Sequence, residues 1–403
     1  MRRVSGEQFI DCTGDGWVGY YAGAEYRLGR ESRAETGEEL AVEQADKITM
    51  SGCVFGPHST FFHTVDRNQP THFVPPVWAA KLPPAEEFGR KILSPNAGNW
   101  WLEHEGTIDD LNDPELARDE LIRIVFGYWD FLKNRWQERS LSANYELVHV
   151  PIWNAKRETR RLIGDHVLTQ QDVQSGRVFP DRISYGGWPL DIHHPRGIYS
   201  GKEGPYAFNA STPLYTIPYR CLYSRNISNL LFAGRDCSVT HVALGTIRVE
   251  STLATLGQAA GTAAALCVRH RVMPRNIYAE HMSELQQVLL LHDQYIPEMK
   301  NEDRADLALK ATVTASSTAS YEFFDRSDVV LGGRHPRDDG SHELTTSRAV
   351  ILPNGVEPRV DEVWLYLDSQ LMTGICGLPI PNNRFRSGLS WTWDRYAASI
   401  RSI

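Results

Sequence analysis

The chain has 403 residues, of which 41% are hydrophobic and 23% charged, a globular composition that excludes collagen, coiled coils and acidic tails. Its formal net charge of −8 provides no basic surface for phosphates, so nucleic acid is excluded as a partner. No run approaches the roughly 18 apolar residues of a membrane span, and no signal peptide opens the chain, so the sequence predicts a cytoplasmic protein without a membrane span.

The first predicted element is a short strand from Gln8 to Cys12, which ends in the glycine turn Thr13-Gly14-Asp15-Gly16. Apolar, β-prone residues followed by glycines are typical of a buried strand that ends in a tight turn. With Gly19 the turn matches G-x-G-x-x-G, so an NAD enzyme is one alternative. The glycine-interrupted residues up to Gly29 do not predict the long helix of that fingerprint, and we favour a tight turn of another kind.

Residues 53–219 are rich in proline, glycine and aromatic residues, which predicts loops and short strands. One strong helix interrupts them, over about 113–134, with Asp113 as the expected N-cap and Pro114 at the first helical position. We expect this whole region to face the substrate.

A second apolar strand, over 229–233, stops at the turn Gly234-Arg235-Asp236. Helices are predicted over about 248–270, with a run of small residues at 257–265, and over about 275–293. A strand, a turn and a helix with a small-residue face can hold a ligand with a polar tail, although such units are also common in packing.

The charged residues 298–306 are the expected linker to a β-rich module over 307–403. Residues 311–317 and 360–367 alternate with period two, as strands do. The start of the module faintly resembles discoidin-like β-sandwich domains, and its tryptophans are candidates either for stacking on sugars or for its core: Trp364, Trp391 and Trp393.

Three histidines are candidate acid/base or substrate-contacting residues, because histidine titrates near neutral pH. His193 and His194 lie in a glycine-rich and aromatic-rich loop, and His241 follows the second glycine turn. The alternative for each is a hydrogen-bonded structural role. Adjacent histidines point in different directions, and no further ligand lies at helical spacing beside them, so the sequence predicts no metal site.

Arg157, Arg160 and Arg161 form a basic cluster in an acidic protein. Guanidinium groups can clamp a carboxylate, and Arg160 is our candidate for such a catalytic role. Salt bridges to Glu158 or Asp165 on a surface element are an equal alternative.

Glu103 follows two tryptophans, and it is a candidate for a buried carboxylate with a raised pKa, with a surface position as the alternative. A hydrolase is not supported, because the chain has no G-x-S-x-G sequence.

Several segments carry a resemblance to a known family. Residues 9–16, with Ala22-Gly23-Ala24, resemble the second glycine motif of FAD-dependent oxidoreductases of the glutathione-reductase-like superfamily. The closing flavin motif of these oxidoreductases resembles residues 229–235, 240–245 and 257–264 of this chain. The chain is also similar to a narrower bacterial family of FAD-dependent oxidoreductases, some of whose members are labelled xanthan lyase. The resemblance lies in residues 100–103, 157–164, 187–195 and 217–220.

The resemblance implies an α/β fold with an FAD-binding, glutathione-reductase-like domain made of residues 1–52 and 220–297. Residues 53–219 are then the substrate-facing insertion, and residues 307–403 a β-sandwich-like module. Members of this superfamily open with a strand, a G-x-G-x-x-G turn and a helix, and this chain starts almost on the later motif. We therefore expect a flavoprotein that lacks its first βαβ unit because it is truncated at the N-terminus.

The implied function is FAD-dependent hydride transfer to or from a small-molecule or saccharide substrate, with no prediction of oligomeric state. The alternative is a non-catalytic flavoprotein remnant that presents a carbohydrate-binding module. The implied catalytic residues are His193, His194, His241 and Arg160. The implied cofactor-binding residues are Thr13, Gly14, Asp15, Gly16, Gly234, Arg235, Asp236, Gly245, Arg248, Gly257, Gln258 and Ala259.

Overall fold

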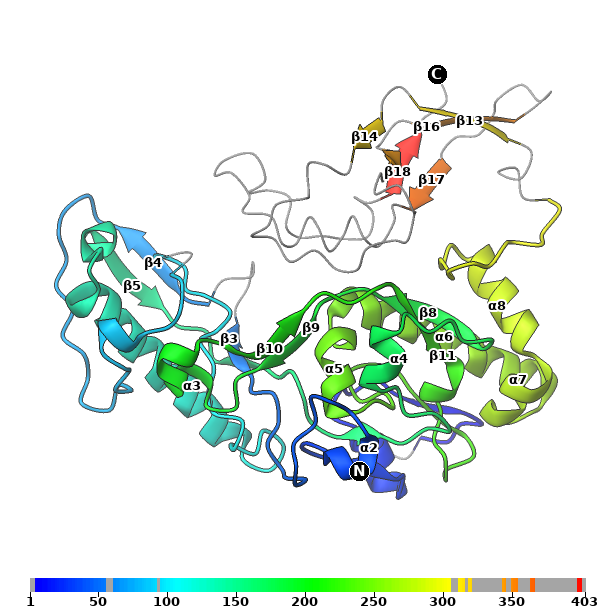
Figure 1. The fold of residues 1–403 in the computed structure, drawn as a ribbon, viewed down its shortest axis with the longest axis horizontal. Helices are drawn as coiled ribbons and strands as arrows, with labels where there is room; N and C mark the ends of the chain where they lie inside the picture. The colour runs from blue at the N-terminus through cyan, green and yellow to red at the C-terminus, as the bar shows by residue number, and fades with distance from the viewer. Residues whose placement is uncertain are drawn as a thin grey trace.

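The computed structural model describes residues 4–55, 61–92 and 95–305, together with short strands between residues 311 and 400. Residues up to 305 form two lobes, each built around its own hydrophobic cluster (Figure 1). The larger lobe carries both predicted glycine turns, and the smaller lobe carries the predicted helix near residue 114. The mixture of helices and strands agrees with the expected α/β fold.

The two predicted strands that lead into the glycine turns lie side by side in the larger lobe. β1 (Phe9–Asp11) pairs in parallel with β12 (Leu230–Phe232), with Asp11 opposite Phe232. Because the strands are parallel, both glycine turns leave the same edge. In open α/β sheets this edge is where ligands bind.

The first glycine turn leads into a short helix, α1 (Trp17–Ala22), which starts and ends at glycines with positive φ, Gly16 and Gly23. The chain then forms β2 (Tyr26–Arg27), which pairs with β7 (Arg161–Leu162), and α2 (Arg33–Thr36). A six-residue helix is too short for a dinucleotide fingerprint. The structure thus agrees with the expected tight turn and does not support NAD binding through this segment.

Helices and an antiparallel strand pair complete the larger lobe. Its helices are α4 (Gln170–Gln174), α5 (His241–Ile247), α6 (Glu250–His270), α7 (Pro274–Glu280) and α8 (Met282–Leu291). Its antiparallel pair is β8 (Arg182–Gly186) with β11 (Tyr215–Pro218). The predicted helix over 275–293 is therefore two helices, and the sequence did not predict α5.

The helix α6 packs against strands of the larger lobe. Its buried residues include Ala259, Ala260 and Ala263, and the helix contacts β1, β12 and β8. Among the described residues, α6 is the one helix long and apolar enough to cross a membrane. Length and composition are weak evidence for a span, and these contacts are those of a helix in a protein core.

The smaller lobe is built around α3 (Pro114–Asp130), which continues into a π-helical turn, η3 (Phe131–Arg135). The predicted helix is confirmed, although the side chain of Asp113 makes no capping hydrogen bond. Tyr128 of the helix packs in an aromatic cluster with Phe62 and Trp101. Two antiparallel pairs flank it, β3 (Cys53–Phe55) with β6 (Trp153–Ala155), and β4 (His63–Asp66) with β5 (Tyr145–His149).

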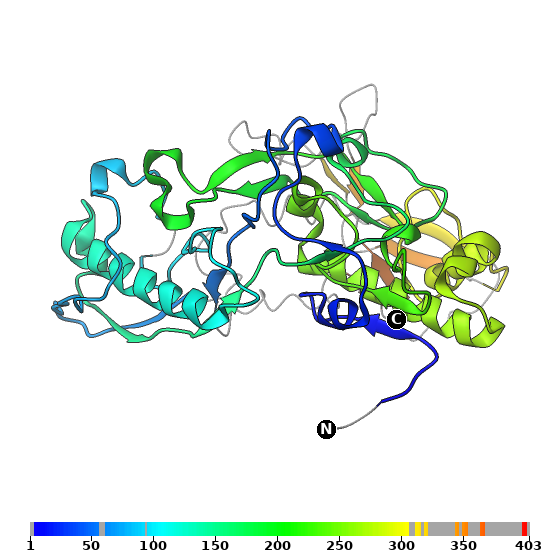
Figure 2. The same cartoon turned by 90° about the horizontal axis from the view of Figure 1, so that it is seen from below.

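A hairpin of β9 (Leu190–His193) and β10 (Tyr206–Ala210), with the helical turn η5 (Gly197–Glu203) at its end, reaches from one lobe to the other (Figures 1 and 2). Leu190 belongs to the hydrophobic cluster of the larger lobe, and Ile198 belongs to that of the smaller lobe. The region over 53–219, expected to be one substrate-facing insertion, therefore contributes to both cores. A composition rich in glycine and proline does not show which core a segment joins.

Beyond residue 305 the described residues form strand pairs alone: β13 (Ala311–Ala315) with β16 (Ala349–Pro353), β14 (Thr318–Ser320) with β15 (Glu343–Thr345), and β17 (Val363–Tyr366) with β18 (Ala397–Ile400). The strands predicted from period-two alternation are confirmed at 311–315 and 363–366. The predicted sugar-stacking residues Trp391 and Trp393 lie outside the described residues, and the sandwich fold stays a prediction.

Candidate functional site

Two buried acids lie where β1 and β12 end. Asp11 accepts hydrogen bonds from the backbone and hydroxyl of Thr13, at 3.0 and 2.7 Å, and from the backbone N–H of Gly19 at 2.9 Å. Asp236 is fully buried, and its carboxyl group interacts with the carboxyl group of Asp11. Burial, and then the nearby charge of Asp11, raise the pKa of Asp236 to about 8. Asp236 therefore carries a proton at neutral pH.

The first glycine turn is held around the carboxylate of Asp15. Gly14 and Gly16 have φ values of +69° and +65°, which favour glycine. Asp15 pairs with Arg235 and with Lys156, each at 2.7 Å. Burial alone would raise the pKa of Asp15, but Arg235 and Lys156 hold it below its usual range. The second glycine turn is thus tied to the first through a charged pair.

Arg160 belongs to this turn as well. Its guanidinium group lies 4.2 Å from the ring centroid of Trp17 and 4.1 Å from that of Tyr20. It donates a hydrogen bond to the backbone carbonyl of Asp15 at 3.2 Å. These contacts fix the turn, and the expected catalytic role of Arg160 stays a prediction.

A first buried charged cluster surrounds His193. Its Nδ1 lies 2.6 Å from Oε1 of Glu103, and its Nε2 lies 3.2 Å from Oδ2 of Asp191. Arg157 lies 3.1 Å from the same oxygen of Glu103, and Arg248 lies 2.8 Å from Asp191. Each ring nitrogen of His193 therefore faces a carboxylate. The cluster therefore holds His193 in place from both sides.

Glu103 is buried, as one expectation had it, but the expected rise in its pKa is wrong. Burial would raise the pKa, whereas His193 and Arg157 hold it below the usual range. The pKa of Asp191 is likewise below its usual range, because His193 and Arg248 outweigh its burial. The sequence analysis missed Asp191, although residues two apart on a strand share a face and Asp191 lies two before His193 on β9.

A second buried cluster surrounds His241, the first residue of α5. Its Nδ1 lies 2.7 Å from Oε2 of Glu158, which also accepts a hydrogen bond from the backbone N–H of Met50 at 2.8 Å. Arg161 lies 3.2 Å from the other oxygen of Glu158 and 2.7 Å from Glu31. The predicted salt bridge of the arginine cluster to Glu158 is thus confirmed. The expected surface position is wrong, since Arg161 is fully buried.

Residues 156–161 connect the glycine turns with both clusters. Lys156 pairs with the carboxylate of Asp15, and the hydroxyl group of Thr159 donates a hydrogen bond to the same carboxylate at 3.0 Å. Arg160 donates to the backbone carbonyl of Asp15. Between them, Arg157 reaches the His193 cluster and Glu158 reaches the His241 cluster. One short segment therefore fixes the predicted cofactor edge relative to both candidate acid/base groups.

A cavity of about 130 Å³ adjoins the His241 cluster. Its walls combine apolar side chains with Arg30, Glu31 and His241. The remaining lining residues are Leu40, Ala41, Val42, Ile192, Ala207, Phe208 and Val242. Of the predicted catalytic residues, His241 is the one that lines it.

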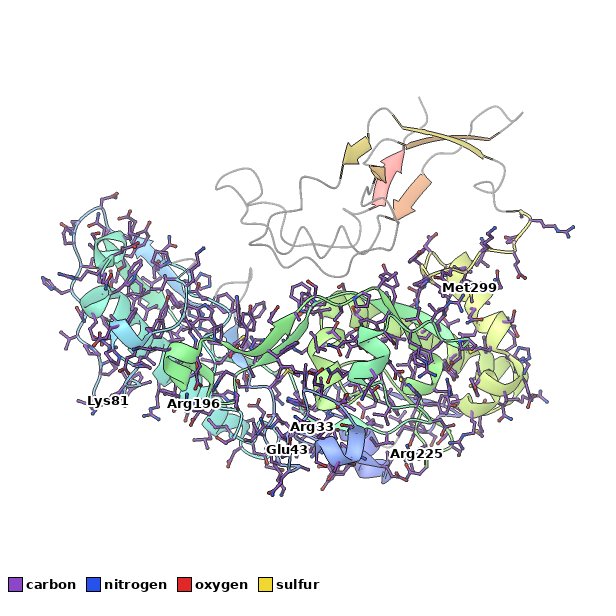
Figure 3. The ribbon with its side chains drawn as sticks, in the orientation of Figure 1. Arg33, Glu43, Lys81, Arg196, Arg225 and Met299 are labelled. Carbon is purple, nitrogen blue, oxygen red and sulfur yellow. The ribbon has the colours of Figure 1, made fainter. Side chains whose placement is uncertain are left out.

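His194 points away from His193, as expected for adjacent histidines. Its Nε2 lies 2.7 Å from Glu203, and its Nδ1 accepts the backbone N–H of Arg196. Arg196 lies on the side of the molecule that carries η5 and α3 (Figure 3). Burial lowers the pKa of His194, with Glu203 opposing the change. These contacts separate His194 from both buried clusters.

Gly257, Gln258 and Ala259 were expected to bind the cofactor. They lie in the interior of α6, where their backbone N–H groups donate within the helix, so a part for them in cofactor binding stays a prediction. The side chain of Gln258 donates instead to the carbonyl of His292 at 3.0 Å.

Gly245, on α5, has a packing reason to be glycine. A Cβ there would lie 2.9 Å from the backbone carbonyl oxygen of Asp191. The helix therefore approaches β9 closely at this position, beside the His193 cluster.

Comparison with known proteins gives one match. No curated protein and no solved structure matches the chain. The model of one protein family, described as FAD dependent oxidoreductase, matches residues 1–289. This range includes both glycine turns and all the charged residues described above. The chain therefore belongs to the FAD dependent oxidoreductase family and is an oxidoreductase with FAD as its cofactor.

Proposed function

We propose that FAD binds across the shared edge of β1 and β12, next to the two buried histidine clusters. Thr13, Gly14, Asp15, Gly16, Gly234, Arg235 and Asp236 would hold it. Two observations support the fit. The backbones of the turns come close, since a Cβ on Gly234 would lie 3.7 Å from Cα of Gly14. The buried carboxyl group of Asp236 interacts with that of Asp11, and its remaining hydrogen-bonding capacity can be met by ligand hydroxyl groups.

FAD, when bound, supplies the hydride acceptor or donor of the reaction. The protein must then move the accompanying proton, and His241 is the residue that we assign to this step. Its Nδ1 is committed to Glu158, so the proton that it exchanges is the one on Nε2. Glu158 keeps the ring oriented. Burial would raise the pKa of Glu158, but His241 and Arg161 lower it, so Glu158 stays a carboxylate.

The His193 cluster supplies the charge that would orient a polar part of the substrate. Two buried atoms of the cluster, Oε2 of Glu103 and Nε of Arg248, have no hydrogen-bond partner among the described residues. The same holds for Nε1 of Trp188, which lies five residues before His193 in the sequence. Buried polar atoms without partners are rare in native proteins and are often completed by a ligand or water. We therefore assign this cluster to substrate binding, in place of the acid/base role expected for His193.

The contacts of residues 156–161 carry this proposal. They tie Asp15, at the predicted FAD edge, to Glu158 and to Arg157 through neighbouring residues of one extended segment. A proton carrier and a charged substrate site are thereby fixed beside the cofactor edge. Fixed positions of this kind are what allow a bound substrate to react efficiently.

The experiment is anaerobic reduction of the flavin in the purified, FAD-loaded chain. A panel of alcohols, amines, hydroxy acids and saccharides is mixed with it, and bleaching of the flavin absorbance is followed by stopped flow. With a donor that bleaches the wild-type flavin, His241→Asn should slow reduction about 10²-fold to 10⁴-fold, which is the usual contribution of a general acid or base.

His194→Asn is the matched control, because His194 pairs with the half-exposed Glu203 outside both clusters. It should leave the rate unchanged, and all variants should retain the FAD content of the wild type. An unchanged rate in His241→Asn would contradict the assignment of the proton to His241.

The finer predictions from the sequence stay proposals. They are a saccharide as the substrate, cytoplasmic location and a place in the bacterial family that includes proteins labelled xanthan lyase. We do not extend the lyase label to this chain, because no residue described here specifies polysaccharide elimination. No described contact favours the non-catalytic alternative either.

A further inference from the structure

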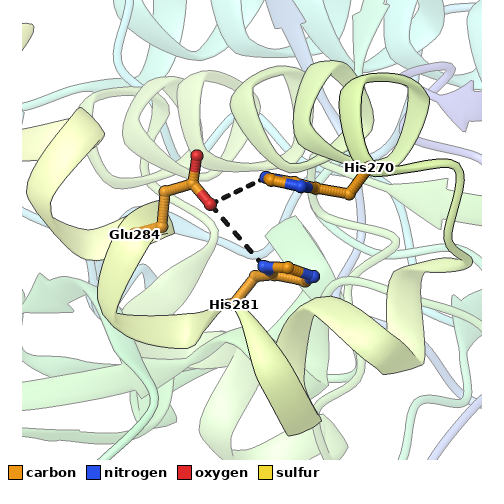
Figure 4. Close-up of side chains that lie close together, drawn as sticks. All are labelled: His270, His281 and Glu284. Carbon is orange, nitrogen blue, oxygen red and sulfur yellow. Dashed lines mark hydrogen bonds and ion pairs between the residues drawn. The ribbon is translucent and has the colours of Figure 1, made fainter.

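We propose that His270, His281 and Glu284 form a binding site for a divalent metal ion of the zinc type. The three side chains converge on one point away from the glycine turns and the buried histidine clusters (Figure 4). Nε2 of His270 lies 2.8 Å from Oε2 of Glu284, and Nδ1 of His281 lies 3.6 Å from the same oxygen. All three candidate ligand atoms lie within 4.8 Å of one another.

Three helix ends bring these residues together. His270 is the last residue of α6, which the left-handed Arg271 terminates. His281 lies between α7 and α8, and Glu284 is in the first turn of α8. Contacts among α6, α7 and α8 hold the three ends in place. The ligand positions are therefore set by packed helices, which position metal ligands better than loops do.

The donor set selects the class of ion. Two imidazole nitrogens and one carboxylate oxygen are ligands that zinc accepts in catalytic and other open sites, with a water molecule as the fourth ligand. Ligands about 2.1 Å from a tetrahedral ion lie about 3.4 Å apart, and the 2.8 and 3.6 Å separations fall on either side of this value. Both separations from the carboxylate oxygen are thus close to those of a zinc site.

The present arrangement of the rings shows what must move. The imidazoles of His270 and His281 are stacked, with centroids 4.0 Å apart and an angle of 15° between their planes. Both ring nitrogens now face one carboxylate oxygen, and an ion at their meeting point requires the rings to tilt apart. The side chains are 29%, 22% and 34% exposed, so an ion can enter from solvent and a water molecule has room beside it.

The other oxygen of Glu284 is only weakly engaged. Arg269 lies 3.5 Å from Oε1, and the Arg269 side chain is largely exposed. Oε2 is therefore the oxygen offered to the ion, and Arg269 does not compete for it.

The test is isothermal titration of the chelator-treated full chain with ZnCl₂ at neutral pH, with Co²⁺ as a spectroscopic probe. We expect one saturable site per chain and cobalt absorption bands typical of four-coordinate geometry. Affinity should fall as the pH is lowered, because protons compete for the imidazole nitrogens. Absence of saturable binding of either ion would overturn the proposal.

Three variants locate the site. His270→Ala and Glu284→Gln should each weaken zinc binding about tenfold or more, equivalent to about 1.4 kcal/mol. His292→Ala removes an exposed histidine at the end of α8 and should leave the affinity unchanged. Circular dichroism and FAD content show that each variant is folded, and either of the first two variants suffices if the other does not fold. Wild-type affinity in a folded His270→Ala or Glu284→Gln chain would overturn the proposal.

Discussion

Nδ1 of His193 lies 2.6 Å from Oε1 of Glu103, a contact that joins the two lobes of the molecule. The two residues are 90 positions apart, and both side chains are almost completely excluded from solvent. Glu103 follows Trp101 and Leu102 of the smaller core, while His193 ends the hairpin strand β9. The pair thereby places the His193 cluster at the junction of the lobes.

Glu103→Gln should destabilise the chain by about 3–5 kcal/mol, because it leaves His193 and Arg157 without their buried counter-charge. The measurement is urea unfolding at neutral pH. Glu115→Gln is the control, since Glu115 forms an exposed pair with Arg118 and should cost less than about 1 kcal/mol. Equal effects of the two substitutions would contradict the importance of the buried pair.

The same pair predicts a pH dependence. The pKa of Glu103 is lowered on folding, so its contribution is present above its unfolded pKa, about 4.3, and is lost as the pH falls through the folded value. The difference in stability between wild type and Glu103→Gln should therefore shrink below about pH 4. Unfolding curves recorded from pH 3 to pH 7 measure it, and a difference that is constant over this range would be inconsistent with the ion pair.

Asp236→Asn should stabilise the chain as the pH rises, whereas Glu103→Gln should destabilise it. The pKa of Asp236 is raised to about 8, so the folded chain favours the protonated acid, and this contribution is lost as the pH rises from the unfolded pKa toward 8. Relative to the wild type, the asparagine variant should gain stability by up to about 1.4 kcal/mol per pH unit over that interval. Urea unfolding without added FAD at pH 5, 7 and 9 tests this, and a variant that shows no relative gain would indicate an ionised Asp236.

Gly234→Ala and Gly257→Ala separate the cofactor edge proposed at β1 and β12 from the one expected on α6. Gly234 has a φ of +143°, and a Cβ would lie 2.9 Å from Oδ1 of Asp236, so alanine should cost about 1–3 kcal/mol and weaken FAD binding. Gly257 has no neighbour within 4 Å of a Cβ, so alanine should stabilise the helix by about 0.5–1 kcal/mol. FAD titration followed by fluorescence quenching distinguishes them, and loss of FAD binding in Gly257→Ala alone would restore the original expectation.

Asp15→Asn should loosen the glycine turn, because Arg235 and Lys156 lose a carboxylate that each contacts at 2.7 Å. Hydrogen bonds to charged groups contribute about 1.5–3 kcal/mol, so we expect a dissociation constant for FAD at least about tenfold higher. Asp165→Asn is the matched control, since Asp165 pairs with Arg275 on α7 at the same distance. A variant of Asp15 that binds FAD as the control does would show that the turn does not hold the cofactor.

Local patterns predicted the elements that local chemistry controls. The strands before both glycine turns and the helix beginning at Pro114 were found from periodicity and from proline at the first helical position. The helix α5 was missed because it is short and buried on all sides, although Thr240 caps it by accepting a hydrogen bond from Ala243. The break at His281 between α7 and α8 has no proline or glycine to mark it.

The candidate site could be predicted only in part, because its charged pairs join distant parts of the chain. The sequence named Glu158 and Asp15 but did not pair them with His241 and Arg235. Glu158 lies 83 residues from His241, and Asp15 lies 220 residues from Arg235. Tertiary packing decides which buried acid each of these side chains contacts. The sequence did predict that His193 and His194 point in different directions, because adjacent side chains do so whatever the tertiary packing.

The most direct test of the account is a crystal structure of the full chain loaded with FAD. The account predicts that the cofactor contacts Gly14, Gly234 and Asp236 at the edge of β1 and β12, with its flavin ring next to His241 and the cavity that His241 lines. Cofactor bound along residues 257–259 of α6, or anywhere that leaves this edge and His241 untouched, would contradict it.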